Sequence, residues 1–169
     1  MRGKVAELEG LLFAAGEALA VPDLAVALEV DETEVVNLVR ELEHHYREEG
    51  HSLTVLEVAG GFRLVVRPEY RDLLVRTVGP RTQRLSRAAL ETLAVIAYLQ
   101  PVTKAKIEDI RGVRVDGILA TLLERGLIQE LGRKEAPGRP ILYGTTKKFL
   151  DHFGLKDLSE LPSLPDGPE

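Results

Sequence analysis

Three stretches before Gly50 carry apolar residues every three or four positions, which is the spacing of a helix face. The first predicted helix ends near Gly16, and Pro22 stands in the first turn of the second, where proline is well tolerated. Asp31 and Glu34 have the spacing of a capped helix start and open the third helix. This third helix carries a single apolar stripe: Val35, Leu38, Val39, Leu42 and Tyr46.

Two runs of alternating polarity follow the third helix. LTVLEV and FRLVVR flank Ala59-Gly60-Gly61, a sequence typical of a hairpin turn. Phe62, Leu64 and Val66 are predicted to point to one face of the second strand, and Val65 to the other. A last helix begins at Pro68.

The second half of the chain repeats this order. Ser86 is predicted to cap a helix that Pro101 ends, and Thr103 opens a short second helix. A third helix ends at Gly126, and the runs LIQEL and PILYG then form a hairpin before the closing helix TKKFLDHFG. The expected inner face of the first of these helices is Leu90, Leu93, Ala94 and Ala97.

The repeated order predicts an α+β fold, mainly helical, with two tandem winged-helix domains. Residues 1–79 form the first domain and residues 86–154 the second, joined by a short arginine-rich linker at 80–85 and followed by a tail at 155–169. The alternative is a single intertwined α+β domain. Each half has about the minimum length for an independent core, so association would stabilise both.

Composition narrows the function classes. The chain is 44% hydrophobic and 29% charged, as in globular proteins, and no apolar run approaches the length of a membrane span. Without cysteine it forms no disulfide or thiolate metal site, and a reducing cytoplasm is expected. Residues 1–79 carry 8 Lys/Arg against 15 Asp/Glu, whereas residues 86–154 carry 11 against 8, which favours domains with different tasks.

Winged-helix domains usually place their third helix in the major groove of DNA. The third helix of the first half has seven acidic residues against two arginines over residues 31–49, a charge that phosphates repel. The third helix of the second half offers Asp116, Thr121, Glu124 and Arg125, and no Asn, Gln or clustered Arg for bidentate base contacts. Neither helix is therefore expected to read a DNA sequence.

The hairpin of the second half carries GRKEAPGRPILYG at residues 132–144, which we call the arm. Its cations Arg133, Lys134 and Arg139, with Lys147 and Lys148 beyond them, suit three roles. The first is a solvated face that keeps the edge of the hairpin from pairing with other strands. The second is a contact for an acidic protein partner, and the third is a nonspecific contact for DNA phosphates.

Candidate chemistry is sparse. His44 and His45 are adjacent on a helix and point about 100° apart, so they cannot chelate one ion together, and Glu41 with His45 is the only plausible metal-binding pair. No phosphate-binding glycine loop, G-x-S-x-G or H-E-x-x-H motif occurs. We expect no enzyme activity, no metal and no cofactor.

The second half carries a specific resemblance. Its segments RGVRVDG, LLERGLI and GRPILYGTT, the opening ELEGLLFAAGEALAVPDLA and the tail LPSL are similar to the segregation and condensation protein B family over essentially the whole chain. The resemblance implies a non-enzymatic subunit of the bacterial SMC (structural maintenance of chromosomes) complex. Such subunits act in chromosome condensation and partition during the cell cycle and cell division.

The resemblance also implies partners and a location. Family members form homodimers mainly through the N-terminal winged helix, and their C-terminal ones hold the kleisin subunit ScpA and through it SMC. The implied place is the cytoplasm at the nucleoid, with weak and nonspecific DNA contact at most and no membrane. A winged-helix transcription regulator is the alternative function.

Two sets of residues are candidate contacts. Because Pro137 and Pro140 pre-set the backbone of the arm, we expect it to be a rigid docking wing with these kleisin contacts: Arg133, Lys134, Pro137, Arg139 and Tyr143. Tyr143 offers an aromatic anchor, or it packs against the last helix instead. The runs LEGLLFAAG and FRLVV hold more apolar residues than one inner face needs, so Leu11, Phe62 and Val65 are candidate dimer contacts.

Overall fold

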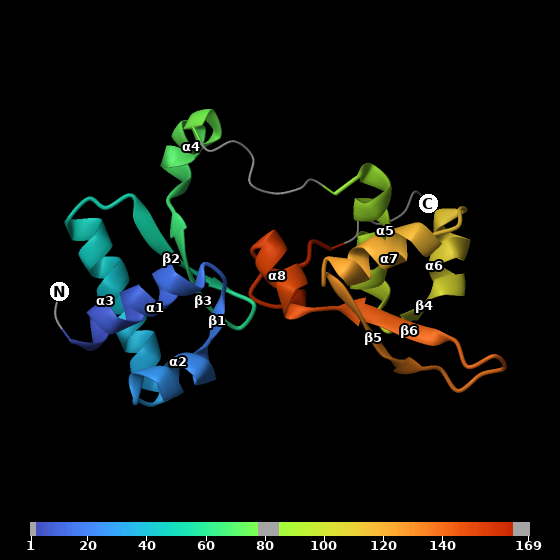
Figure 1. Ribbon diagram of the computed structural model, residues 1–169, viewed down its shortest axis with the longest axis horizontal. Coiled ribbons are helices and arrows are strands. Elements are labelled where there is room, and N and C mark those ends of the chain that lie inside the picture. The colour runs from blue at the N-terminus through green and yellow to red at the C-terminus, as the bar shows by residue number, and fades with distance from the viewer. Residues whose placement is uncertain (1–2, 78–84, 164–169) are drawn as a thin grey trace. The chain divides into compact units, whose positions relative to one another are not determined.

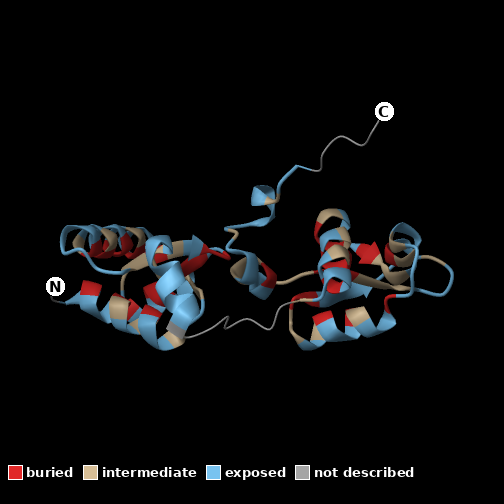
Figure 2. Ribbon diagram, turned by 90° about the horizontal axis from the view of Figure 1, so that it is seen from above, coloured by how far each residue is buried: buried red, intermediate tan, exposed pale blue. Residues whose placement is uncertain are grey.

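The computed structural model describes residues 3–77 and 85–163 and divides the chain into two compact units (Figure 1). The first unit comprises Met1–Arg81 together with the end of the chain from Gly154, and the second comprises Thr82–Phe153. Within each unit the buried residues lie on the inner faces of the helices and strands (Figure 2). Residues 80–84 of the predicted linker lie outside the described residues.

The first unit follows the predicted order of helices and hairpin. Its elements are α1 (Lys4–Ala15), β1 (Leu19–Ala20), α2 (Val21–Leu28), α3 (Glu32–Glu48), β2 (Leu53–Val58), β3 (Gly61–Val66), the 3-10 turn η1 (Pro68–Tyr70) and α4 (Arg71–Thr77). The strands form an antiparallel sheet in the order β1-β3-β2. The two-residue strand β1 was not predicted.

The second unit repeats this plan. Its elements are α5 (Arg87–Leu99), β4 (Val102–Thr103), α6 (Lys104–Arg111), α7 (Asp116–Glu124), β5 (Ile128–Arg133), β6 (Ile141–Thr145) and α8 (Lys147–Phe153). Its antiparallel sheet has the equivalent order β4-β6-β5. The predicted fold class, α+β and mainly helical with two tandem winged-helix domains, is confirmed.

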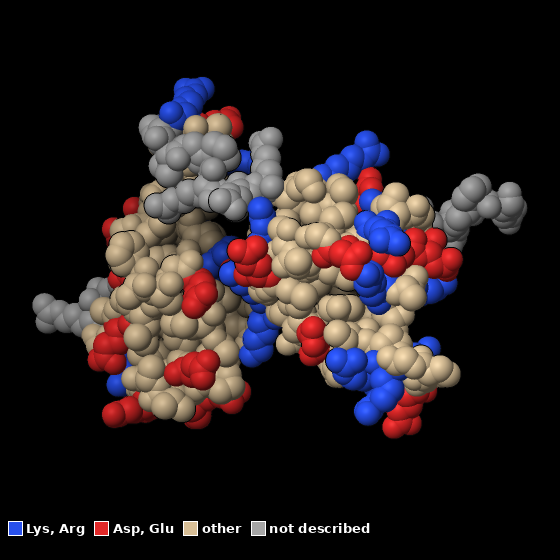
Figure 3. All heavy atoms as spheres, turned by 45° about the vertical axis from the view of Figure 1, so that its right-hand side comes forward, with Lys and Arg blue, Asp and Glu red and all other residues tan. Residues whose placement is uncertain are grey.

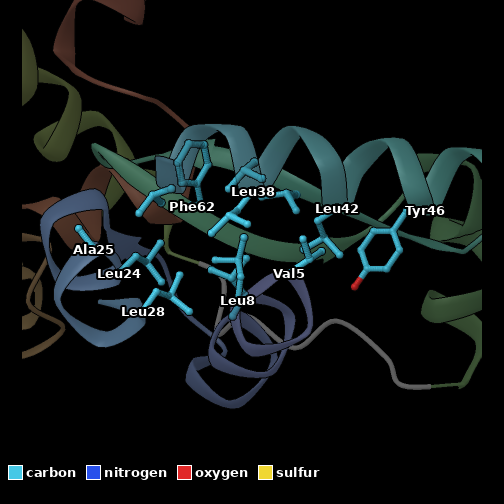
Figure 4. Packing of buried hydrophobic residues seen from close by; sticks show 13 residues of the cluster. Val5, Leu8, Leu24, Ala25, Leu28, Leu38, Leu42, Tyr46 and Phe62 are labelled. Carbon is cyan, nitrogen blue, oxygen red and sulfur yellow. The ribbon is translucent and has the colours of Figure 1, made fainter. Parts of the chain in front are cut away.

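The core of the first unit is built around α3. All five residues of the predicted α3 stripe are at most 5% exposed. Residues of α1, α2 and β3 point toward this stripe, among them Leu8, Leu24 and Phe62 (Figure 4). At the end of the stripe the Tyr46 hydroxyl donates a hydrogen bond of 2.5 Å to Glu9, which ties α3 to α1.

The predicted helix starts are confirmed by their capping bonds. Asp31 accepts a hydrogen bond from the Glu34 N–H at 2.8 Å, and Ser86 accepts one from the Ala89 N–H at 3.2 Å. Thr103 opens α6 in the same way. These caps satisfy backbone donors that have no partner inside the helix.

The predicted inner face of α5 is partly wrong. Leu93 and Ala97 are buried, but Leu90 is 43% exposed and Ala94 also faces solvent. The buried face is completed by Ala89, Thr92 and Ile96. Small and apolar residues occur all around this helix, so their pattern does not determine which side faces the core. Thr92 is polar, yet it is fully buried and accepts a hydrogen bond from Arg111.

The start of the predicted tail binds the first unit. The N–H groups of Ala59 and Gly60, in the β2–β3 turn, donate to the carbonyl oxygens of Leu155 and Lys156 at 2.9 and 3.1 Å. The Lys156 ammonium lies 2.7 Å from the Glu57 carboxylate. The tail, which the sequence left outside both domains, thus begins as part of the first unit, and the 3-10 turn η2 (Leu158–Glu160) follows.

Gly61 permits the close pairing of β1 with β3. It lies opposite Ala20, and a Cβ atom at this position would overlap the Leu19 carbonyl group. Because that neighbour is backbone rather than a flexible side chain, β1 would have to move to make room.

We predict that Gly61→Ala lowers the free energy of unfolding of the first unit by about 1–3 kcal/mol, the usual cost of overpacking. Gly10→Ala is the matched control: it lies in α1 with open space around its Cβ position, and it should raise stability by roughly 0.5–1 kcal/mol. Urea denaturation of the full chain, followed by circular dichroism, measures both. Equal stability of the two variants would contradict this account of β1.

Candidate protein-docking site

The arm is held rigid by its own backbone. The β5–β6 ladder ends at the pair Arg133 and Ile141, and beyond it the Lys134 N–H donates to the Pro140 carbonyl at 2.9 Å. Inside the loop, the Arg139 N–H donates to the Ala136 carbonyl at 2.9 Å. The loop therefore has a defined conformation before any partner binds, which lowers the entropy lost on docking.

The cations of the arm differ in what they contact. The Arg133 guanidinium donates to the carbonyl oxygen of Arg139 at 3.1 Å, so it fastens the two sides of the arm. Lys134, Pro137 and Arg139 are exposed, and Arg139 has a positive φ of 40° that places it at the sharp end of the loop. Lys and Arg atoms gather at the lower right of Figure 3, with acidic atoms beside them, and acidic atoms are spread over both units.

Tyr143 is not the exposed anchor that the sequence suggested. It is 7% exposed and is paired with Val102 and Glu130 in the middle of the sheet. Burial, followed by the nearby Glu130 carboxylate, raises the pKa of its phenol above the usual value. The alternation of β6 places Tyr143 on the inner face, a position that only the strand register reveals.

A groove lies beside the arm. It has a volume of about 430 Å³ and is lined by α5, α6 and the two strands between them and the arm: Leu99, Pro101, Val102, Thr103, Lys106, Lys134 and Leu142. Of this set, only Lys134 was predicted from the sequence as a partner contact. Five of the other lining residues fall within residues 99–106, and the fold brings them together with Leu142 and Lys134 of the hairpin.

Lys104 lies at the start of α6 but is neutralised within the unit. Its ammonium pairs with the Asp116 carboxylate and lies 3.8 Å from Glu108. The hydrogen bond to Lys104 is the main cause that lowers the pKa of Asp116 below its ordinary 3.8, and the same bond raises the pKa of Lys104. Lys104 is therefore less available to a partner than Lys106 or Lys134.

The three candidate dimer contacts of the first unit lie in different environments. Leu11 and Val65 are half-buried. Phe62 is 7% exposed and belongs to the unit's own core, so it is not available as a surface contact. Phe13 on α1 and Val26 on α2 are 75% and 80% exposed, and neither belongs to the buried face of its helix, so both are apolar surface residues that were not predicted as contacts.

The exposed side chains of α3 carry an excess of acid, as expected from the sequence. Glu32, Glu34, Glu41 and Glu48 are exposed, against Arg40 and Arg47. Among residues 3–77 and 85–163 no group of three His, Cys, Asp or Glu side chains is placed to hold a metal ion. In the same part of the chain no helix has the length and apolar character needed to cross a bilayer.

Known proteins resemble the whole chain. The family model for the segregation and condensation complex subunit ScpB matches residues 6–164. Segregation and condensation protein B of Moorella thermoacetica is 56% identical over 161 residues, which are 95% of this chain and 83% of the relative. The Symbiobacterium thermophilum protein of the same name is 53% identical over 157 residues, 93% of this chain and 72% of the relative. A solved dimer of an ScpB N-terminal domain, complexed with an ScpA peptide, is 32% identical, covers 48% of this chain and 99% of its own, and has a TM-score of 0.45.

We predict that Asp116→Asn destabilises the second unit at pH 7 and has less effect as the pH falls. The pKa of Asp116 is lower in the folded state than in the unfolded state, where it is near 3.8. The ionised carboxylate therefore stabilises the folded unit above this pH, and the stabilisation is lost as the pH falls and the carboxylate becomes protonated. Urea midpoints at pH 7, 5 and 3 measure this difference. Lys104→Gln removes the same pair from the other side, and the losses at pH 7 should not be additive. A difference that stays constant down to pH 3 would exclude the pair as its cause.

Proposed function

The chain belongs to the family of the segregation and condensation complex subunit ScpB, and we propose that it acts as a homodimer that binds the kleisin subunit ScpA. In this role it is a non-enzymatic scaffold of the bacterial SMC complex, which condenses and separates chromosomes. Its partners are ScpA and, through ScpA, SMC. We place it in the cytoplasm at the nucleoid, where its own contact with DNA is weak and nonspecific.

The observation that carries this proposal is the excess of exposed acidic residues on α3. A winged helix that read DNA would bring this helix to the phosphates, but Glu32, Glu41 and Glu48 repel them. In the second unit, α7 exposes Thr121 and Glu124, and it has no Asn, Gln or Arg that could make bidentate contacts with bases. Both features favour protein contact over the transcription-regulator alternative.

We assign one association to each unit. Residues 1–79 form the dimer, and residues 86–154 hold the kleisin through the arm. The arm supports the second assignment because its backbone is fixed while Lys134, Pro137 and Arg139 are exposed. Arg133 and the buried Tyr143 contribute by holding the arm in shape.

The proposed dimer surface of the first unit is apolar. Leu11 and Val65 remain its candidate contacts, whereas the exposed Phe13, two positions after Leu11 in α1, points to the other side of that helix and is not part of this patch. Phe62 supports this surface from the core rather than contacting the partner. A symmetric dimer would set each such patch against its copy and remove these side chains from water.

Residues 1–79 expressed alone should be dimeric, and residues 86–169 should be monomeric and retain part of the kleisin affinity. Light scattering gives the mass of each fragment, and calorimetry with purified kleisin gives its affinity. A monomeric first fragment beside a dimeric second one would reverse the assignment. Kleisin binding by residues 1–79 alone would move the kleisin contact to the first unit.

Arg139→Glu is expected to weaken kleisin binding by about three- to tenfold without unfolding the chain, because it reverses one exposed charge at an interface. Both residues have a Cβ atom and meet the positive φ at a similar cost, so the backbone is not the cause. Arg114→Glu, an exposed reversal outside the arm, is the control. Calorimetry in which both variants match the wild type would remove Arg139 from the interface.

A further inference from the structure

The groove beside the arm has an apolar floor. Leu99 at the end of α5 is 45% exposed, Pro101 is exposed and Leu142 of β6 is half-buried, and all three line the same hollow. Single exposed leucines are ordinary on protein surfaces. Three apolar side chains from two segments, the end of α5 and β6, that share one concave site are the arrangement of a binding site.

The rim of the groove is basic. Lys106 enters from α6 and Lys134 from the arm, and none of the described residues that line the groove is acidic. The Lys106 ammonium lies 3.1 Å from Asp109, with both side chains largely exposed, and such surface pairs are weak enough to exchange partners. The backbone of Lys134 is fixed by its hydrogen bond to Pro140, so this lysine is positioned in advance.

Two grooves of the first unit have mixed charge instead. One lies between α3 and the β2–β3 hairpin, and its charged lining residues are Arg40, Glu43 and Glu57. Another lies beside α2 and is lined by Glu32 and Arg40. The groove of the second unit therefore suits an acidic ligand better than these two do.

We propose that the groove of the second unit binds an amphipathic, acidic segment of the kleisin. Apolar side chains of this segment cover Leu99, Pro101 and Leu142, and its carboxylates pair with Lys106 and Lys134. This inference rests on the proposed function, since it takes the kleisin as the partner. Duplex DNA fits less well, because its phosphates would satisfy the lysines and leave the apolar floor in water.

The test uses the full chain and purified kleisin from the same cells, with affinity measured by calorimetry. The double variant Lys106→Glu/Lys134→Glu should weaken binding about tenfold or more, because it reverses two charges at the rim of the groove. Leu99→Ser should weaken it about fivefold, because it removes apolar contact. The control Arg47→Glu/Arg114→Glu makes the same charge change at exposed positions outside the groove and should leave affinity unchanged.

Synthetic peptides tiling the kleisin then locate the segment. The peptide that binds should contain both leucine-type and acidic residues, and replacing its acids by lysine should restore affinity for the double variant. Circular dichroism and the urea midpoint show whether each variant is folded.

The outcomes separate the two proposals. If the wild-type chain does not bind kleisin, the proposed function fails. If kleisin binds the wild type and the groove variants equally, the groove inference is overturned and the proposed function stands. A double variant that loses only duplex DNA binding, with kleisin affinity unchanged, also overturns it and makes DNA the ligand of the rim.

Discussion

In each unit a glycine in the middle strand of the sheet lies directly against another segment of the chain, and the rest of the unit depends on this close approach. At Gly61 the neighbouring segment is β1, which pairs with β3 and lies between α1 and α2 in the chain. At Gly144 the space of a side chain is filled by Gln100, at the end of α5, and by Leu131. Gln100 also accepts a hydrogen bond from the Thr145 N–H at 2.7 Å. The first helix of each unit is thereby fixed to its hairpin, which gives the arm a rigid base.

Features set by neighbouring residues could be predicted from the sequence. The α3 stripe and the caps at Asp31 and Ser86 depend on residues within one or two helical turns, and the structure has all of them. Strands β1 and β4 could not be predicted, because two residues become a strand only through a distant partner. The docking of Lys156 beside Glu57 is equally nonlocal.

The candidate site was predicted less well than the fold, for the same reason. Exposed cations and prolines of the arm are visible in the sequence, but burial is a tertiary property. Phe62 and Tyr143 are both large and apolar enough to suit an interface, but both are buried in the core of their own unit. The groove could not be predicted, because Leu99, Lys106 and Leu142 meet only after the unit has folded.

Charge alone does not determine which partner binds the second unit. Exposed lysines and arginines speed encounter with an acidic partner, but each pair contributes little affinity in water and is weakened by salt. The arm's cations would attract any polyanion, whether DNA or protein. Discrimination therefore needs a surface that only one of these can cover, and the apolar floor at Leu99, Pro101 and Leu142 supplies it. A protein segment removes that floor from water, whereas a phosphate backbone does not.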